Sequence, residues 1–340
     1  MFGIRFLGEG RLETSTDHPE PAYGPSDVKI ALRMSGICGT DLHSFGHPGR
    51  PSLNPPADTI PGHEVCGTVA AVGDAVTGFA VGDRVVANHI IGCGLCEYCR
   101  LGAPHFCPAR QRIGREVTGS MGQFVVAPER NVFRLDDELS FVDGALMACN
   151  FGTAYAALRR AGASGAHTVA VFGLGPVGLC VVLAARALGA GVIGVEPNAH
   201  RRELARRTGG VVVVDPSTED PVEAARGVDI AVDVTGVPVA QNQALDATRA
   251  LGTTVLLGVG GETRIDPFRQ LIAKDLTVIG SYTYKLGEFA DMSRFLRRHR
   301  LSLRQIVTST YPPQQAEAAF QEAVSGSSGK ILFDWSGVDA

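Results

Sequence analysis

The arrangement of hydrophobic and polar positions divides the chain into two kinds of region. Up to about residue 150, short apolar stretches such as 28–32 alternate with glycine-rich turns, which predicts a small, barrel-like, mostly-β domain. A helix is expected at 156–161, and from there apolar segments of strand length and helix length alternate, at 169–172, 177–188, 192–195, 200–208, 211–214, 221–225, 230–234, 241–250, 254–257 and 276–279. This alternation is typical of a doubly wound parallel sheet, so we expect the α/β fold class. Two amphipathic helical patterns, 288–299 and 313–325, and a closing strand at 330–335 follow.

Three glycines follow the apolar segment 169–172 in the order Gly173-x-Gly175-x-x-Gly178, and a helix-length apolar run comes next. This strand, turn and helix context is the one that a dinucleotide-binding fingerprint requires. The glycines allow a tight turn and a close approach of the pyrophosphate, and the first turn of the helix offers free N–H groups to phosphate. We therefore predict that the cofactor is bound by this turn and by two later segments near the nicotinamide, through Gly173, Gly175, Pro176, Val177, Gly178, Gly258, Val259 and Ser281.

Glu196 ends the strand that follows this helix, 18 residues beyond Gly178. A carboxylate at that position accepts hydrogen bonds from both ribose hydroxyls and repels a 2′-phosphate, so we expect NAD rather than NADP. Arg201 and Arg202 complicate this prediction. Arg201 could contact the adenosine ribose, whereas a solvated arginine pair on a helix would produce the same pattern.

The strongest metal signal is a set of four cysteines with the spacing C-x2-C-x2-C-x7-C, namely Cys93, Cys96, Cys99 and Cys107. Glycines at 92, 94 and 102 allow the loop to curl around them. Four thiolates at this spacing predict a closed tetrahedral zinc site, which is structural because no position remains for a substrate. An iron–sulfur cluster uses similar spacing, and a disulfide pair is a further, less favoured alternative.

A second polar cluster follows the strand predicted at 28–32. It contains Cys38, Thr40, Asp41 and His43. On its own this cluster fits a buried cysteine with helix-capping side chains as well as it fits chemistry. The segment 61–67 changes that balance, because His63 offers a neutral imidazole suited to zinc and Glu64 places a carboxylate beside it.

Composition argues against several function classes. The net charge of −4 and the pI near 6.1 argue against a nucleic-acid-binding surface. The longest apolar run, 177–188, carries Arg186 and is too short to span a bilayer. The first residues, MFGIRFLGEG, have neither the basic nor the apolar region of a signal peptide, so we expect a cytoplasmic protein. In that compartment, eight cysteines favour metal ligation over disulfides.

Taken together, these segments resemble the zinc-dependent alcohol dehydrogenases of the medium-chain dehydrogenase/reductase superfamily. The family's zinc signature, G-H-E-x2-G-x5-G-x2-V, is met by residues 62–76, and its structural-zinc lobe, G-C-G-x-C-x2-C-x2-G-x4-C, is met by residues 92–107. The resemblance implies a GroES-like catalytic domain at 1–149, a Rossmann domain that binds NAD at 150–281, and a return to the catalytic domain at 282–340.

The resemblance also implies a second zinc ion in each chain. It places this catalytic zinc on Cys38, His63 and Cys149, and two thiolates with one imidazole leave the fourth position open to a substrate oxygen. The two remaining cysteines, Cys66 and Cys180, are then small buried hydrophobic residues.

Roles for five other residues follow from the same resemblance. Thr40 would take the alcohol proton, and His43 would relay it to water by way of the nicotinamide ribose. Asp41 would hold the second nitrogen of His63, Glu64 would sit behind the zinc and assist ligand exchange, and His89 would line the substrate pocket. A simpler interpretation exists for three of them: His43 as an exposed loop histidine, Glu64 as a buried ion-pair partner, and His89 as a residue outside the pocket.

These features predict an enzyme that transfers a hydride between an alcohol, expected to be secondary, and NAD, giving a ketone or an aldehyde. The alternative is a polyol, sugar-alcohol or amino-alcohol dehydrogenase of the sorbitol or threonine type. The short connection at 49–60 favours that alternative, whereas Cys149 resembles the simple-alcohol branch. A non-catalytic protein is disfavoured because the candidate zinc ligands are intact. The resemblance implies a homodimer or homotetramer, and we expect neither a nucleic-acid nor a membrane partner.

Overall fold

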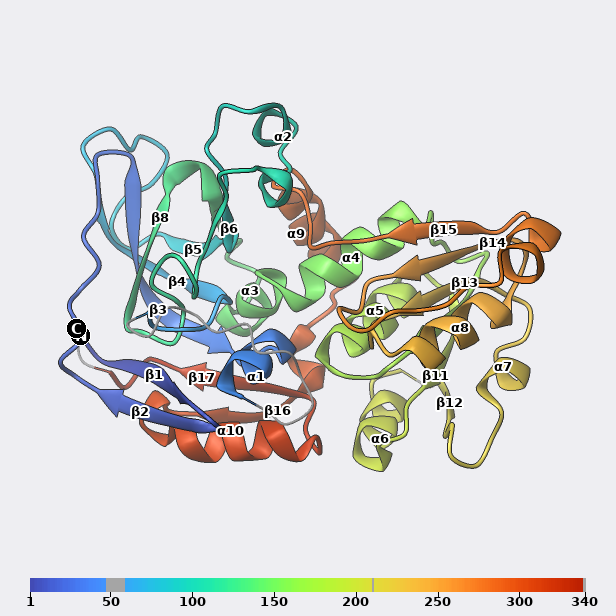
Figure 1. Ribbon diagram of the computed structural model, residues 1–340. Coiled ribbons are helices and arrows are strands. Elements are labelled where there is room, and N and C mark those ends of the chain that lie inside the picture. The colour runs from blue at the N-terminus through green and yellow to red at the C-terminus, as the bar shows by residue number, and fades with distance from the viewer. Residues whose placement is uncertain (47–58, 210, 339–340) are drawn as a thin grey trace. The chain divides into compact units, whose positions relative to one another are not determined.

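The computed structural model describes residues 1–46, 59–209 and 211–338 (Figure 1). Most of the connection at 49–60, which bears on the choice of substrate class, lies outside the described residues. The chain divides into two compact units. The first consists of Met1–Gly152 together with Lys285–Ala340, and the second is Thr153–Tyr284.

The first unit is built on a seven-stranded sheet centred on β3 (Asp27–Gly36). β3 pairs antiparallel with β4 (Val65–Val72), β8 (Phe124–Pro128) and β17 (Lys330–Asp334). The sheet continues from β4 to β5 (Arg84–Ala87) and β9 (Val132–Arg134), and from β17 to β16 (Val307–Tyr311). Strand β17 therefore brings the last part of the chain beside the strand that leads to Cys38.

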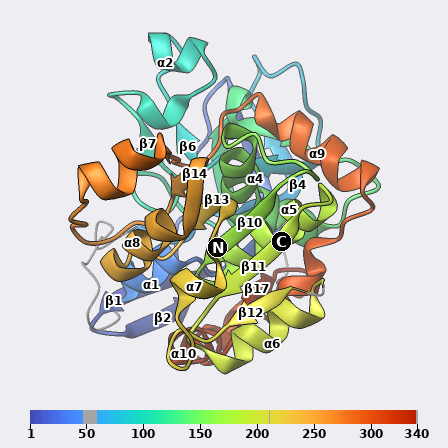
Figure 2. The same ribbon diagram turned by 90° about the vertical axis from the view of Figure 1, so that its right-hand side faces the viewer.

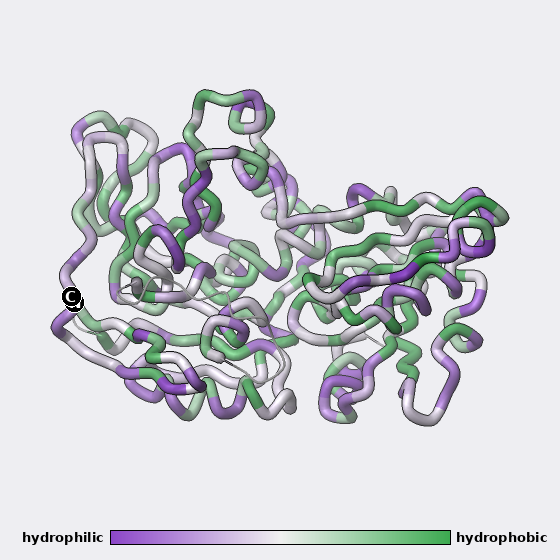
Figure 3. The backbone as a smooth tube through the Cα atoms, in the orientation of Figure 1, coloured by the Kyte–Doolittle hydropathy of each residue, from purple (hydrophilic) through white to green (hydrophobic). Residues whose placement is uncertain are grey.

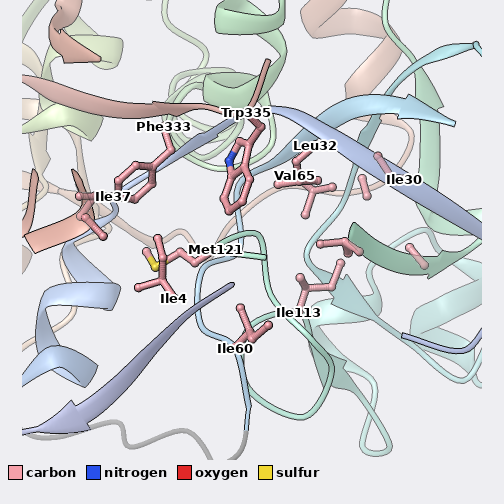
Figure 4. Packing of buried hydrophobic residues seen from close by; sticks show 14 of the residues in the cluster. Ile4, Ile30, Leu32, Ile37, Ile60, Val65, Ile113, Met121, Phe333 and Trp335 are labelled. Carbon is pink, nitrogen blue, oxygen red and sulfur yellow. The ribbon is translucent and has the colours of Figure 1, made fainter. Parts of the chain in front are cut away.

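Alternate residues of β3 point into one hydrophobic core. Val28, Ile30 and Leu32 are buried, whereas the residues between them are half-buried, as expected of a strand with one covered face. Figure 4 shows Leu32 near Val65 and Trp335 in this core. Because the core contains residues from both ends of the chain, it holds the C-terminal return in place.

Shorter elements complete the first unit. A small hairpin pairs β1 (Gly3–Gly8) with β2 (Arg11–Ser15), and a separate antiparallel pair joins β6 (Ile90–Ile91) to β7 (Gln111–Arg112) across the intervening segment 92–110. The helices are α1 (Gly39–Phe45), α2 (Glu97–Arg100), α3 (Phe141–Met147), α9 (Glu288–Arg298) and α10 (Ala316–Ser325), with 3-10 turns at Pro104–Phe106, Glu129–Asn131, Leu303–Ile306 and Pro313–Gln315. Helix α4 (Asn150–Arg160) begins in this unit and ends in the other.

The second unit is a six-stranded parallel sheet in the order β12-β11-β10-β13-β14-β15. Its strands are β10 (Thr168–Phe172), β11 (Gly191–Val195), β12 (Val212–Val214), β13 (Val228–Asp233), β14 (Thr248–Leu256) and β15 (Thr277–Gly280), and its helices are α5 (Pro176–Ala187), α6 (Ala199–Arg207), α7 (Pro221–Ala224) and α8 (Pro238–Ala247). Figure 2 shows α5 and α6 on one side of the sheet and α8 on the other. This strand order, with helices on both faces, confirms the predicted Rossmann fold.

The helices of the second unit differ in polarity according to their place. Helix α5 is buried from Gly178 to Ala185, whereas in α6 only Ala205 is buried, and Figure 3 shows α6 as mainly hydrophilic. A helix whose whole circumference is apolar must be covered on all sides, while α6 needs only one covered face. Within the described residues, no helix is both long and apolar enough to cross a membrane.

Several element boundaries differ from the predictions. The strand expected at 254–257 begins already at Thr248, and the strand expected at 28–32 continues to Gly36. The helix expected at 241–250 ends at Ala247, because Thr248 takes an extended backbone and opens β14, while its hydroxyl donates to the carbonyl of Ala244. The helix expected at 156–161 begins already at Asn150. Helix α1 contains Thr40, Asp41 and His43 and was not predicted as a helix. Seven residues are too few to display helical periodicity.

Candidate metal centres and active site

A short helix at the end of β3 positions the first candidate ligand. Cys38 is the N-cap of α1, and its backbone N–H donates to Oδ2 of Asp41 at 2.8 Å. The other carboxylate oxygen, Oδ1 of Asp41, lies 3.3 Å from Nδ1 of His63. One buried carboxylate therefore fixes both the first turn of α1 and the ring of His63.

Cys38, His63 and Cys149 converge although Cys38 and Cys149 are 111 residues apart in sequence. The two Sγ atoms lie 3.9 Å apart, and Nε2 of His63 lies 3.4 Å from Sγ of Cys149. A tetrahedral zinc ion, with Zn–S bonds of about 2.3 Å and Zn–N bonds of about 2.0 Å, needs about 3.8 Å and about 3.5 Å between such atoms. The observed separations match these values, so the three side chains fit zinc and leave its fourth position open.

The electrostatics of this cluster also favour a divalent cation. A hydrogen bond from the thiol of Cys149 holds the pKa of Cys38 well below its usual range, against the effect of burial. Burial opposes a charged imidazole at His63, but Asp41 and the Cys38 thiolate together raise the pKa of His63 well above its usual value. These shifts arise from contacts among the ligand side chains themselves, and a metal that displaces the protons of His63 and Cys149 would replace those contacts.

Glu64 lies beside these ligands and is paired on its far side with a lysine. Its Oε1 accepts from Nζ of Lys330 at 2.6 Å, and the same Nζ donates to the carbonyl oxygen of Ile37 at 2.9 Å. A carboxylate oxygen of Glu64 also lies within 4.8 Å of the ligand atoms of Cys38, His63 and Cys149. A side chain at Gly36 would collide with this pair, since its Cβ would lie 2.0 Å from Oε2 of Glu64.

Three further predicted site residues lie around the cluster. The hydroxyl of Thr40 is 4.0 Å from Sγ of Cys38, and His43 follows three residues later on the same face of α1. Nδ1 of His89 lies 3.3 Å from the carbonyl oxygen of Ala148, and its ring centroid is 5.1 Å from that of His63. Burial, with the charge of His63, lowers the pKa of His89 to about 3, so this imidazole is neutral at physiological pH.

The four clustered cysteines form a separate group. The Sγ atoms of Cys93, Cys96, Cys99 and Cys107 all lie within 4.8 Å of one another. Backbone N–H groups point at two of the sulfurs, from Cys96 to Sγ of Cys93 at 3.4 Å and from Cys93 to Sγ of Cys107 at 3.4 Å. Gly94 has a φ of 82°, which residues other than glycine rarely adopt. The loop therefore needs glycine there to fold back on itself. Four sulfurs in this arrangement fit a closed metal site.

The glycine-rich turn of the second unit has the form that a dinucleotide needs. Gly173 has a φ of 95°, and a Cβ on Gly178 would lie 1.9 Å from the carbonyl oxygen of Gly173. Gly175 is the N-cap of α5, with Pro176 and Val177 as the first helical residues. The turn is therefore open enough for a phosphate to meet the N–H groups of α5.

Glu196 is held tightly against this turn. Its two carboxylate oxygens accept from the N–H groups of Leu174 at 2.7 Å and Asn198 at 3.0 Å, and the side chain is buried. Arg201 extends toward the turn, with Nη1 3.9 Å from where a Cβ of Gly175 would lie. Arg202 forms an ion pair with Asp215 at 2.7 Å, and its Nη1 donates to the carbonyl oxygens of Glu196 at 2.9 Å and Pro197 at 2.6 Å.

The other predicted cofactor residues follow the carboxyl ends of β14 and β15. Gly258 packs so closely on the backbone of Gly236 that a Cβ would lie 2.0 Å from its nitrogen. Val259 is exposed, and Ser281 is buried. Gly173 follows β10 and Glu196 follows β11. All of these residues therefore lie at the carboxyl ends of the strands, where ligands bind in doubly wound folds.

Comparisons with known proteins agree with this architecture. Residues 24–137 match the alcohol dehydrogenase GroES-like domain, and residues 176–298 match the zinc-binding dehydrogenase domain. An L-threonine 3-dehydrogenase of Alteromonas mediterranea is 32% identical over 326 residues, which cover 94% of this chain and 95% of the relative. The chain belongs to the zinc-dependent alcohol dehydrogenase family. It is therefore a zinc-type oxidoreductase, as the sequence predicted.

Solved structures of other dehydrogenases superpose on nearly the whole chain. The 2R,3R-butanediol dehydrogenase of Bacillus subtilis is 31% identical, with a TM-score of 0.87 over 98% of this chain and 99% of that one. A Sinorhizobium meliloti zinc-binding dehydrogenase crystallised with NADP is 28% identical, with a TM-score of 0.86 over 98% of each chain. The comparisons thus support a nicotinamide cofactor, whereas they do not decide between NAD and NADP.

Two residues of this dehydrogenase that lie against the metal cluster were not identified from the sequence. Lys330 is fully buried, and its only sequence signal is a charged residue at the head of the apolar strand β17. Asn150 is also buried, and its Nδ2 lies 3.9 Å from Sγ of Cys38 and 3.8 Å from Sγ of Cys149. No spacing or motif distinguishes Asn150 from an ordinary residue at the start of a helix.

Proposed function

We propose that this dehydrogenase oxidises a secondary alcohol to a ketone with NAD as the hydride acceptor. The observation that carries the proposal is the convergence of Cys38, His63 and Cys149 at zinc-ligand separations, with one coordination position left over. Protein sites with three ligands are open to substrate, whereas sites with four are closed. The four-cysteine group is of the closed kind, and we propose that it holds a second, structural zinc ion.

Cys38, His63 and Cys149 would hold a zinc ion that supplies Lewis-acid polarisation of the alcohol oxygen, and the second unit would hold a nicotinamide that supplies the hydride acceptor. The side chains of the chain itself prepare that site. Asp41 accepts from Nδ1 of His63, which keeps the lone pair on Nε2 available to the metal. Lys330 holds one oxygen of Glu64, so the second oxygen stays near the ligands without being free to rotate away.

A proton must also leave the alcohol hydroxyl. Thr40 offers a hydroxyl that both accepts and donates, 4.0 Å from Sγ of Cys38 and exposed at the start of α1. His43 lies on the same face of α1, one helical turn further from the cluster. We assign Thr40 as the group that receives the proton and His43 as the base that carries it toward water.

The proposed preference for NAD rests on Glu196. The carboxylate lies at the end of β11, and both of its oxygens retain lone pairs after accepting one backbone N–H each. Those lone pairs suit ribose hydroxyls and repel a 2′-phosphate. Arg201 supplies positive charge beside the same turn, so the preference for NAD is expected to be incomplete.

The names of two relatives point to the substrate class. L-threonine and 2,3-butanediol both carry a secondary hydroxyl next to a second polar group. His89 is suited to such a neighbour: if Nδ1 donates to the carbonyl of Ala148, then Nε2 is an acceptor for a hydroxyl or ammonium group. A polyol or amino alcohol is therefore the alternative to a simple secondary alcohol.

The test is a substrate panel with the purified zinc-loaded protein and NAD, followed by NADH absorbance. Simple secondary alcohols, 2,3-butanediol, sorbitol and L-threonine would be compared by kcat/KM. The highest value for a simple alcohol supports the first assignment, and a value at least about 10-fold higher for a vicinal diol or amino alcohol supports the alternative. Absence of NADH formation with every alcohol, from protein that binds zinc at Cys38, His63 and Cys149, would overturn both.

We also propose that the protein is a cytoplasmic homodimer or homotetramer. Strand β15 is at one edge of the six-stranded sheet, and Val278 on that strand is exposed. Phe268 and Ile272, in the turns that precede β15, are exposed as well. An uncovered strand edge with apolar neighbours is a natural place for a second copy to pair. Sedimentation analysis of the wild type and of Val278→Lys tests this, with a monomeric wild type as the contrary result.

A further inference from the structure

Asn150 lies between the two candidate thiolates of the three-ligand site. Its Nδ2 is 3.9 Å from Sγ of Cys38 and 3.8 Å from Sγ of Cys149, within the range of weak hydrogen bonds to sulfur. The side chain is 1% exposed, so water does not compete for these contacts. A primary amide nitrogen carries two hydrogens, which is one for each sulfur.

The orientation of this carboxamide follows from the chemistry of its neighbours. A thiolate bound to a metal only accepts hydrogen bonds, so the nitrogen rather than the oxygen must face the sulfurs. Within the described residues, Oδ1 of Asn150 is buried and has no hydrogen-bond partner. Leaving a buried acceptor unpaired is costly, so the contacts on the nitrogen side must favour this orientation.

The position of Asn150 in α4 suggests a more ordinary role, which the contacts do not support. Asparagine at the start of a helix usually caps it by accepting a backbone N–H through Oδ1. Here Oδ1 accepts no such bond, although Asn150 is the first residue of α4. The contacts of the side chain are instead those of Nδ2 with the sulfurs of Cys38 and Cys149.

We propose that Asn150 is a positioning residue that donates one N–H to each thiolate of the catalytic zinc site and so tunes the metal. Hydrogen bonds to thiolate sulfur withdraw electron density from it, which makes the bound ion a stronger Lewis acid. They also hold the two sulfurs at a fixed separation before the metal arrives. This inference rests on the proposed function, because it requires a metal at Cys38, His63 and Cys149.

The test uses protein in which cadmium-113 replaces zinc at both sites, so that each site gives its own NMR resonance. Asn150→Val removes the donor and fills most of the space with apolar atoms. Asn150→Ala removes the donor without any risk of overpacking. In both variants the resonance of the two-thiolate site should move, while that of Cys93, Cys96, Cys99 and Cys107 should stay as an internal reference. Release of zinc from the two-thiolate site to a chelator should be faster by roughly 10-fold.

A matched control is Asn131→Ala. Asn131 is equally buried in the same unit, but its Nδ2 donates to the carbonyl oxygen of Ile90 at 2.7 Å rather than to sulfur. This variant should lose stability and leave the two-thiolate resonance unchanged. An unmoved resonance in both Asn150 variants would overturn the role of Asn150 and leave the proposed function intact. A wild-type protein with no two-thiolate resonance would instead overturn the metal assignment itself.

Discussion

The ammonium nitrogen of Lys330 lies 2.6 Å from Oε1 of Glu64, and both side chains are completely buried. The two residues are 266 positions apart, so the pair joins the start of β17 to the residue next to His63. Burial raises the pKa of Glu64 to about 7 even with Lys330 beside it, which shows how much the carboxylate depends on that partner. The pair holds a carboxylate oxygen within 4.8 Å of the ligand atoms of Cys38, His63 and Cys149.

Lys330→Met should destabilise the first unit strongly. The substitution leaves the carboxylate of Glu64 buried and unpaired, and removing one partner of a buried pair typically costs about 3–5 kcal/mol. Adding Glu64→Gln should recover part of this loss, because the double variant no longer buries a lone charge. Urea unfolding of the zinc-loaded protein measures both. Lys29→Met, whose partner Glu20 is half exposed, serves as the control and should cost no more than about 1 kcal/mol.

Each chain should bind two zinc ions that differ in how easily they leave. The open site loses its metal first, because one of its four positions is held by an exchangeable group, whereas the four-cysteine site is closed. Elemental analysis should give two zinc per chain, and one after mild chelation, with the circular dichroism spectrum unchanged. A single zinc in freshly purified protein, or iron in place of zinc, would contradict this.

The coenzyme preference should depend on Glu196 and Arg201 in opposite directions. Glu196→Gln removes the charge that repels a 2′-phosphate, so the ratio of kcat/KM for NAD over NADP should fall by roughly 10-fold. Arg201→Gln should raise the same ratio, since it removes positive charge near the turn. Arg206→Gln is the control, because Arg206 lies on the exposed side of α6 and pairs with Glu203, and should leave the ratio unchanged. A wild type that prefers NADP would show that Arg201 dominates.

His43→Gln should slow alcohol oxidation without removing zinc. General-base assistance is worth roughly 10²–10⁴-fold, and we expect the lower end or less because His43 acts through Thr40 rather than on the substrate. The loss should be largest at low pH, where solution base is scarce, and added imidazole should restore part of the rate. The control is His200→Gln on the exposed surface of α6. Identical pH profiles of kcat/KM for wild type and His43→Gln would remove His43 from the proton route.

Asp229 should make the second unit less stable in acid. The N–H of Thr168 donates to Oδ2 at 2.7 Å and Nε of Arg249 donates to Oδ1 at 2.7 Å, and these bonds lower the pKa of Asp229. A carboxyl group whose pKa is lowered on folding stabilises the protein above its unfolded pKa, about 3.9, and loses that effect as the pH falls through the folded value. The melting temperature of Asp229→Asn should lie about 2–4 °C below the wild type at pH 7. The gap should narrow as the pH falls below about 3.9, and a constant gap would disprove the linkage.

The sequence was most informative where the chemistry is local. The glycine turn, Glu196 and the four cysteines lie in short segments with fixed spacing; the turn and Glu196 follow β10 and β11, and the four sulfurs lie within 4.8 Å of one another. Lys330 and Asn150 could not be found in this way. Glu64 lies 266 residues from Lys330 and Cys38 lies 112 residues from Asn150, and neither periodicity nor spacing encodes a contact at such separations. The need for glycine at position 36 could not be predicted either. A side chain there would collide with the buried Glu64–Lys330 pair, which the sequence does not reveal.

The two cysteine sites also differ in when they can exist. The four sulfurs of one site span only 14 residues, so a small loop brings them together at little entropic cost. The other site closes a loop of 111 residues and needs the sheet around β3 to be assembled. During synthesis, the lobe from Cys93 to Cys107 is complete before Cys149 has been translated. A nascent chain can therefore bind a metal ion at the four-cysteine site while the site of Cys38, His63 and Cys149 is still unformed. The site proposed to be catalytic is thus completed last.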